Sequence, residues 1–137
     1  MLFDASAIIN LLVSKGGAGL DIARGNDILD LTVYEAGNAL WKLSVLQHKI
    51  SSAEADSLLG ALLRVGLDRM NMVRVSGLDH AAISSLARTE RVSYYDASYV
   101  RAAIERKCDL VTDDLRLSRM ASKLVTVKGS TDLLSPL

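Results

Sequence analysis

The sequence contains very little cysteine, proline or aromatic residue, and its charges cancel. It has one cysteine and one proline among 137 residues, and aromatic side chains make up 4%. A single cysteine excludes a disulfide framework and any zinc site built from several cysteines, and it is typical of a reducing compartment. With 16 basic and 16 acidic residues the formal charge is zero, so the strongly basic composition of many nucleic-acid-binding domains is missing.

Long apolar runs are missing as well. No segment approaches the roughly 18 residues needed to span a bilayer, and no basic stretch precedes the first apolar segment as it would in a signal peptide. Half of the residues are nonetheless hydrophobic, which is enough to bury an aliphatic core. We therefore expect one soluble domain over residues 1–137, located in the cytoplasm and without membrane contact.

Short apolar segments alternate along the chain with longer segments of helical periodicity. Strands are expected at residues 1–3, 28–31, 72–75, 110–112 and 124–127, and helices at 32–47, 51–67, 79–89, 94–107 and 114–122. The glycine-bearing residues 15–19 are expected to form a flexible loop. The alternation predicts an α/β fold with a mainly parallel central sheet of about five strands, flanked by helices.

Acidic residues follow several of the predicted strands. Asp4 directly follows the first strand, and Asp113 and Asp114 directly follow the fourth. Glu35 and Asp96 lie in the first turns of two predicted helices. Because ligands of open parallel sheets bind at the carboxyl ends of the strands, we expect these acids to share one edge of the sheet. Carboxylates gathered there repel one another unless a cation neutralises them.

Each acid also has a purely structural interpretation when it is taken alone. The spans Thr32–Glu35 and Ser93–Asp96 fit a helix capping box, as does Ser51–Glu54, and Asp4 or Asp114 could serve as a helix N-cap. Convergence of the acids favours a metal site instead. Ligands that are all oxygen select Mg²⁺ or Mn²⁺ rather than zinc, and such ions support phosphoryl chemistry, so a phosphodiester is the natural substrate.

Other common catalytic groups have weak support. His48 and His80 lie far apart in the sequence and lack a second ligand at metal-binding spacing. Cys108 has no histidine nearby that could activate it as a nucleophile. Glycine-rich phosphate-binding motifs are missing too, so a nucleotide cofactor is not expected.

Four segments of the sequence match the motifs of one family in order and spacing. They are Phe3–Ser6, Thr32–Leu40, Tyr94–Tyr99 and Leu110–Asp114. With these segments essentially the whole chain resembles the PIN-domain family, and most of all the VapC-type toxin ribonucleases of prokaryotic toxin–antitoxin pairs. The resemblance implies a PIN-like nuclease domain that uses Mg²⁺ or Mn²⁺ to cleave RNA endonucleolytically.

The resemblance also implies roles for individual residues. The family's acidic quartet, expected to be catalytic and to bind the metal, is matched by Asp4, Glu35, Asp96 and Asp114. The small hydroxyl residues that accompany the quartet are matched by Ser6 and Thr112. Because Asp113 directly precedes Asp114, the alignment leaves open whether Asp113 shares the role of Asp114. Three of the acids would hold one or two ions, and Glu35 would position or deprotonate water or support a second metal.

Partners are implied less directly. Arg116, Arg119 and Lys123 lie on one face of a predicted helix and could contact RNA phosphates, although a solvated face explains them equally well. Tyr34 and Trp41 are expected in the core or at a partner interface rather than under stacked bases. The resemblance implies a homodimer and a small antitoxin protein that docks in the acidic groove.

The alternative is a non-catalytic PIN-like binding or assembly module. Such a module would keep the sheet and bind a partner through its apolar helices. It has no need for four carboxylates that repel one another, and this argues against it.

Overall fold

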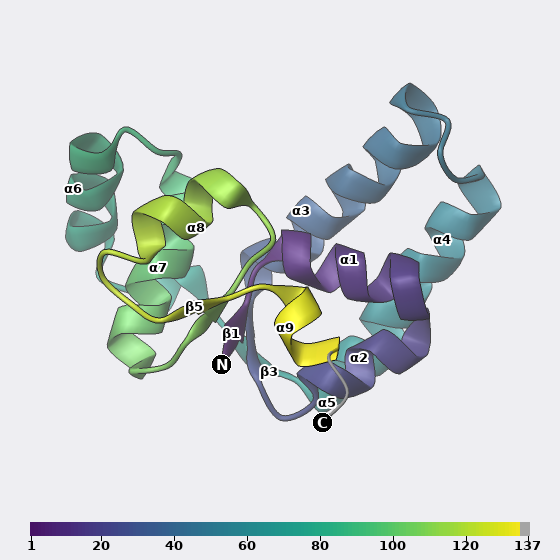
Figure 1. Ribbon diagram of the computed structural model, residues 1–137, viewed down its shortest axis with the longest axis horizontal. Helices are drawn as coiled ribbons and strands as arrows, with labels where there is room; N and C mark the ends of the chain where they lie inside the picture. Colours follow the sequence, from purple (N-terminus) through teal and green to yellow (C-terminus); the bar gives the residue numbers. More distant parts are fainter. Residues whose placement is uncertain (135–137) are drawn as a thin grey trace.

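The computed structural model describes residues 1–134, apart from the side chain of Val65, and contains one sheet of five parallel strands (Figure 1). The strands are β1 (Leu2–Phe3), β2 (Asp27–Leu29), β3 (Asn71–Val73), β4 (Leu110–Val111) and β5 (Val127–Lys128). Their order across the sheet is β3-β2-β1-β4-β5, so the first strand of the chain lies in the centre. The expected α/β fold with a parallel sheet is confirmed.

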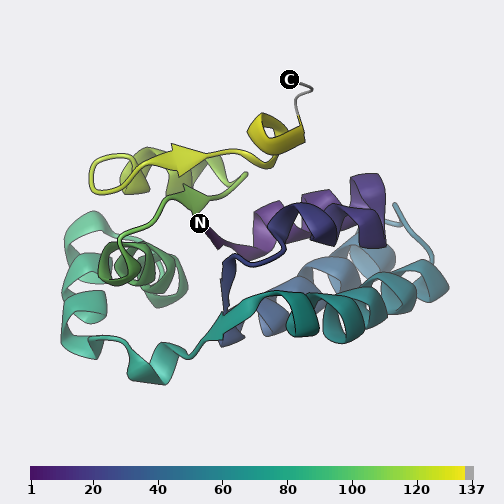
Figure 2. The same cartoon turned by 90° about the horizontal axis from the view of Figure 1, so that it is seen from below.

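Helices cover both faces of this sheet (Figure 2). They are α1 (Ala5–Lys15), α2 (Gly17–Ala23), α3 (Asp30–Trp41), α4 (Ser52–Ala61), α5 (Leu67–Arg69), α6 (His80–Glu90), α7 (Tyr94–Arg106), α8 (Leu115–Ala121) and α9 (Ser130–Leu134). Helix α3 continues into a π-helical segment at Lys42–Leu46, and α4 does so at Leu62–Gly66. A 3₁₀ turn at Val75–Gly77 follows β3. No helix within residues 1–134 is both long and apolar enough to cross a membrane.

Alternating side chains of the short strands build two separate cores. Phe3, Ile28 and Val111 are fully buried against the layer that contains α1, α2 and α3. Their neighbours Leu2 and Leu110 are fully buried on the opposite face, among residues of α7 and α8. This is the two-residue period of a strand that is covered on both sides. The strands are therefore held rigidly, and so are the loops at their carboxyl ends.

The glycines of residues 15–19 do not form a flexible loop, so that prediction is wrong. Gly16 alone makes the turn between α1 and α2, with a φ of +58° that favours glycine. Helix α2 begins at the next residue, and Gly19 is buried against α1, where a Cβ atom would lie 2.2 Å from the carbonyl oxygen of Leu11. Glycine thus permits two helices to pack closely here.

Several predicted boundaries are also wrong. The strand expected at 124–127 begins only at Val127, because the backbone N–H groups of Leu124 and Val125 both donate to the carbonyl of Ala121 and hold the chain in a turn. The strand expected at 28–31 ends at Leu29, because Asp30 starts α3. Helices α1, α2 and α9 were not predicted.

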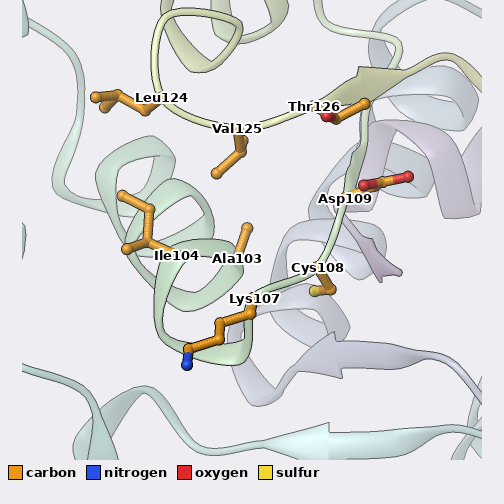
Figure 3. Close-up of a pocket in the computed structure, with 8 residues that line it drawn as sticks. All are labelled: Ala103, Ile104, Lys107, Cys108, Asp109, Leu124, Val125 and Thr126. Carbon is orange, nitrogen blue, oxygen red and sulfur yellow. The ribbon is translucent and has the colours of Figure 1, made fainter.

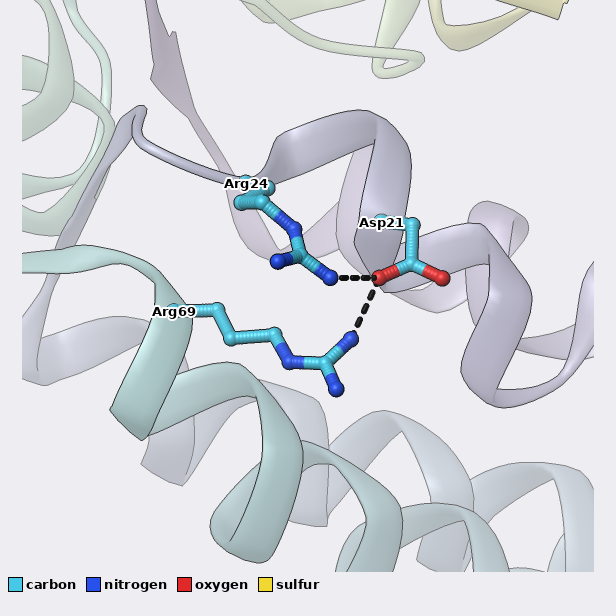
Figure 4. Close-up of polar contacts among 3 residues, drawn as sticks. All are labelled: Asp21, Arg24 and Arg69. Carbon is cyan, nitrogen blue, oxygen red and sulfur yellow. Dashed lines mark hydrogen bonds and ion pairs between the residues drawn. The ribbon is translucent and has the colours of Figure 1, made fainter.

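An ion-pair cluster on the surface joins α2 to α5 (Figure 4). One carboxylate oxygen of Asp21 accepts from Arg24 at 2.8 Å and from Arg69. The hydrogen bond from Arg24 is the main cause that lowers the pKa of Asp21. Because all three side chains are substantially exposed, the cluster contributes little to stability. It lies away from the acidic edge and serves only to join two helices.

Candidate active site

Asp4 lies at the carboxyl end of the central strand and is 3% exposed. Its carboxylate caps α1 by accepting the backbone N–H of Ala7 at 2.9 Å. Burial is the main cause that raises its pKa from 3.8 to about 6, and the hydrogen bonds it accepts offset part of this effect. A buried, charged carboxylate without a cationic partner is unfavourable. The position of Asp4 therefore needs an explanation beyond helix capping.

The hydroxyls of Ser6 and Thr112 both contact this carboxylate. Ser6 Oγ donates to Asp4 at 2.8 Å and accepts the backbone N–H of Asp113 at 2.9 Å. Thr112 Oγ1 also donates to Asp4 and accepts the backbone N–H of Asp114 at 3.1 Å. Both hydroxyls thus connect the Asp4 carboxylate to the loop after β4. The two supporting residues singled out from the sequence lie together at this junction.

The adjacent acids Asp113 and Asp114 point to different partners. The Asp113 carboxylate accepts from Asn10 at 2.8 Å, from the backbone N–H of Ser130 at 2.7 Å and from the Ser130 hydroxyl. It therefore ties α1 and the start of α9 to the loop. The Asp114 side chain is exposed and caps α8 through the N–H of Leu117 at 2.9 Å. The charge of Asp113 acts on Asp4 and that of Asp114 acts on Asp96, while the carboxylate of Asp113 is already engaged by three donors.

Glu35 does not cap a helix, contrary to one of the two interpretations of its sequence. Helix α3 begins at Asp30, so Thr32 lies inside the helix and forms no cap. Glu35 Oε1 instead accepts a hydrogen bond of 2.8 Å from the hydroxyl of Tyr99 on α7. Burial and the nearby charge of Asp96 raise the pKa of Glu35, while the bond from Tyr99 lowers it.

Asp96 is half-buried in the first turn of α7. Ser93 caps this helix by accepting the N–H of Asp96 at 3.0 Å. Burial raises the pKa of the Asp96 carboxyl, the charge of Asp114 raises it further, and hydrogen bonding with the Ser93 side chain and the charge of Arg116 lower it. Of the three spans that fit a capping box in the sequence, Ser51–Glu54 is the one that forms both reciprocal bonds in the described structure.

Tyr99 is a residue of this site that the sequence analysis did not single out. It is 2% exposed, and its hydroxyl lies 2.8 Å from Thr32 Oγ1 as well as from Glu35. Burial raises its pKa well above the ordinary value, so it remains a neutral hydrogen-bond donor. Its position three residues after Asp96, on the same helix face, and the need of a buried hydroxyl for a partner were available signals.

Charges at this edge act in pairs: Asp96 raises the pKa of Glu35, Asp114 raises that of Asp96, and Asp113 raises that of Asp4. The pKa values of Asp4, Glu35 and Asp96 are all raised, and none of the four acids forms an ion pair with a described basic residue. Within residues 1–134 no three His, Cys, Asp or Glu side chains form a ready metal-binding cluster. The oxygen-only donors suit Mg²⁺ or Mn²⁺ bound by one or two carboxylates together with water, rather than by an all-protein cage.

The basic residues of α8 are already partly engaged. Arg116 donates to the backbone carbonyl of Arg91 at 3.0 Å, and Lys123 pairs with Glu90 at 2.9 Å. Together with Arg119 they line a hollow of about 410 Å³ between α8 and the end of α6. Arg116, whose charge acts on Asp96, is the one placed toward the acidic edge.

A second hollow, of about 370 Å³, lies at the opposite edge of the sheet (Figure 3). Asp109 and Thr126, which line it, directly precede β4 and β5, so it opens at the amino ends of these strands. Cys108 lies there, and burial raises the pKa of its thiol. A thiol that remains protonated is a poor nucleophile, and ligands of parallel sheets bind at the other edge.

Comparison with known proteins agrees with this architecture. No protein-family model matches the sequence. A curated relative, the exonuclease VapC9 of Pyrobaculum aerophilum, is 34% identical over 106 residues, which are 77% of this chain and 70% of the relative. The crystal structure of PAE2754 from the same organism matches with a TM-score of 0.74 and 29% identity, covering 97% of this chain and 85% of that one. The chain thus belongs to the VapC-type PIN-domain family.

Proposed function

We propose that the protein is a Mg²⁺- or Mn²⁺-dependent ribonuclease that hydrolyses phosphodiester bonds within RNA chains, and that it is the toxin of a toxin–antitoxin pair. One observation carries the proposal. Acids from β1–α1, α3, α7 and the β4–α8 loop lie at the same sheet edge, three have raised pKa values, and none is ion-paired within residues 1–134. A divalent cation would offset the cost of holding these carboxylates ionised.

When bound, the cation would activate water and stabilise the charge that develops on the phosphate. Asp4, Asp96 and Asp114 are the proposed ligands. Glu35 is the proposed acceptor of the proton of the attacking water, because its raised pKa brings its basicity closer to neutral pH. The bond from Tyr99 fixes the direction of the Glu35 carboxylate. Ser6 and Thr112 hold Asp4 in one orientation through their hydroxyls.

The nuclease assignment is supported by the name of the relative from Pyrobaculum aerophilum, which is an exonuclease. Its activity on chain ends differs from the internal cleavage proposed here. A circular single-stranded RNA separates the two modes, because only an endonuclease converts the circle into a linear product. An end-labelled linear RNA that loses single nucleotides while the circle stays intact would replace our proposal with exonucleolytic cleavage.

Cleavage of the circle should require Mg²⁺ or Mn²⁺ and should be lost in the variant Asp4→Asn. Asparagine keeps the size of the side chain and its ability to cap α1, so loss of activity reports the missing charge rather than unfolding. Asp79→Asn is the matched control, since Asp79 caps α6 in the same way but is exposed and is not one of the four acids. Full activity of Asp4→Asn would refute the proposal.

The non-catalytic module remains the competing hypothesis. It predicts neither RNA cleavage nor heat on titration of the metal-stripped protein with Mn²⁺. Measurable Mn²⁺ binding that is lost in Asp4→Asn would exclude it.

The proposed partners are a second copy of the chain and a small antitoxin. Exposed apolar side chains on α3 and the π segment after it, Trp41, Val45 and Leu46, offer a surface for either. Size-exclusion chromatography with light scattering tests the dimer. Co-expression with the protein encoded by the adjacent gene tests for a stable complex that suppresses RNA cleavage.

A further inference from the structure

A hollow next to the acidic edge is lined largely by tyrosines. It has a volume of about 240 Å³ and lies between the start of α3, the 3₁₀ turn after β3 and the start of α7. Tyr34, Tyr94 and Tyr95 line it, and they are 79%, 38% and 57% exposed. The fourth tyrosine of the chain, Tyr99, lies on the same helix and contacts Glu35. All four tyrosines of this aromatic-poor sequence thus lie where α3 and α7 meet.

The tyrosine-lined hollow lies between the two helices that carry Glu35 and Asp96. Tyr34 directly precedes Glu35 on α3, and Tyr95 directly precedes Asp96 on α7. The bond between Tyr99 and Glu35 ties these two helices together at this place. A ligand that occupies the hollow would therefore contact the residues that directly precede Glu35 and Asp96.

One wall of the hollow is held in place. The rings of Tyr94 and His80 are stacked, with centroids 6.2 Å apart and planes inclined by 10°, and the Tyr94 hydroxyl contacts His80 Nδ1. Asp30 accepts the backbone N–H groups of Leu31 and Val75, each at 3.0 Å, which fastens α3 to the 3₁₀ turn. Tyr34, by contrast, projects into solvent and is not needed for the core.

The charges around the hollow decide what can enter it. Its lining holds one charged group, the Asp30 carboxylate, and no basic side chain. A phosphate inside the hollow would therefore face a negative charge. A neutral planar group that stacks on tyrosine fits both the negative surroundings and the aromatic walls, and it covers apolar surface that is otherwise exposed. In a single-stranded nucleic acid that group is the base.

Building on the proposed function, we infer that the tyrosine-lined hollow binds an unpaired nucleobase of the RNA, next to the phosphate that is cleaved. Tyr34 supplies the exposed stacking surface, and Tyr94 and Tyr95 supply the opposite walls. The expectation from the sequence that Tyr34 lies in the core is wrong, because its side chain is 79% exposed; a place at a protein interface, the other expectation, is the competing outcome of the test. Trp41, at the other end of α3, lines a different hollow.

The test measures affinity for a short single-stranded RNA by fluorescence anisotropy, in a background with Asp4 intact and with Ca²⁺ in place of Mg²⁺ to suppress cleavage. Tyr34→Ala should weaken binding about 5- to 150-fold, which corresponds to about 1–3 kcal/mol of base stacking, whereas Tyr34→Phe should bind as tightly as tyrosine. Trp41→Ala is the matched control, because Trp41 is also an exposed aromatic residue of α3, and it should bind normally.

A series of RNAs, each with one abasic position, identifies the base. At one position the removal of the base should weaken binding to the parent protein but cause no further loss in Tyr34→Ala, since the two changes remove the same contact. Equal affinity of Tyr34→Ala and the parent, or an equal loss in Trp41→Ala, would overturn the inference. Either result would also leave the hollow to a different occupant, such as a side chain of a protein partner.

A substrate without a base separates this inference from the proposed function. A ribose–phosphate oligomer that is abasic at every position keeps the phosphodiesters and carries no planar group, and the otherwise native Tyr34→Ala protein should hydrolyse it at the native rate with Mn²⁺. If the native protein cleaves RNA and Tyr34→Ala cleaves it equally well, only the base-binding site is refuted. If the native protein cleaves neither substrate, the proposed function fails and the base-binding site fails with it.

Discussion

Replacing Asp4 by asparagine should stabilise the fold when no metal is present. Burial raises the pKa of Asp4 from 3.8 to about 6, and this shift corresponds to about 3 kcal/mol that opposes the ionised form of the folded protein. Asparagine cannot ionise and still caps α1. Its amide accepts through one oxygen instead of two, which loses about 1 kcal/mol of hydrogen bonding from Ser6 or Thr112. The net gain at pH 8 is therefore about 2 kcal/mol.

The sign of this effect depends on pH. A raised pKa in the folded state means that the folded protein binds the proton more tightly than the unfolded chain does. Below pH 3.8 both states hold the proton and Asp4 carries no penalty. The penalty grows as the pH rises from 3.8 to about 6 and is complete above that range. The stability gain of Asp4→Asn should follow the same curve.

Thermal unfolding in EDTA, followed by circular dichroism at pH 4, 6 and 8, measures this gain. At pH 8 the melting temperature of Asp4→Asn should exceed that of the native protein by roughly 6 °C, and the difference should largely vanish at pH 4. Asp79→Asn, the exposed N-cap of α6, should show no such pH-dependent gain. An Asp4→Asn protein that is no more stable than the native one at pH 8, or a gain that is equal at pH 4 and 8, would refute the reasoning.

Three further predictions concern the surroundings of the site and the fold. Tyr99→Phe removes the hydroxyl that donates to Glu35 and should lower kcat about 10- to 100-fold, since a hydrogen bond to a charged group contributes about 1.5–3 kcal/mol. Because the bond from Tyr99 lowers the pKa of Glu35, its loss should move the acidic limb of the pH–rate profile to higher pH. An unchanged profile would contradict the positioning role of Tyr99. In Mn²⁺ titrations Asp114→Asn should bind the ion more weakly than the native protein, whereas Asp113→Asn should bind it equally well. Asp113→Asn should instead lower the free energy of unfolding, measured in urea, by about 1–3 kcal/mol, because Asp113 accepts from Asn10 and Ser130. The reverse pattern would exchange the roles of the two acids. Gly19→Ala should destabilise the fold by about 1–3 kcal/mol or more, because its Cβ would meet the backbone of α1; unchanged unfolding in urea would show that the two helices separate easily.

The alternation of strands and helices could be predicted because it depends on local apolar patterns. Each strand has only two or three residues, so one turn is enough to shorten a predicted strand. Before β5, the bonds from Leu124 and Val125 to the carbonyl of Ala121 form such a turn, and the strand begins later than predicted. The close approach at Gly19 could not be predicted, because a glycine that permits helix packing looks the same in sequence as one in a loop. Helix α1 was missed although Asp4 is a good N-cap.

The four acids could be assembled from motif spacing, but their surroundings could not. Whether Glu35 caps a helix depends on where α3 begins, and its first residue, Asp30, accepts a tertiary hydrogen bond from the backbone N–H of Val75. The division of labour between Asp113 and Asp114 depends on Asn10 and on the start of α9, which are distant in sequence. Contacts between residues so distant in sequence can be predicted only when the order of the strands in the sheet is known.

Direct binding of a divalent ion by the acidic edge is the central claim, and it is tested by isothermal titration of the metal-stripped protein with Mn²⁺ at pH 8. The native protein should bind Mn²⁺ with measurable heat, Asp4→Asn should lose this binding, and Asp79→Asn should keep it. Heat equal to that of dilution in the native protein, or the same affinity in native and Asp4→Asn proteins, would contradict the account.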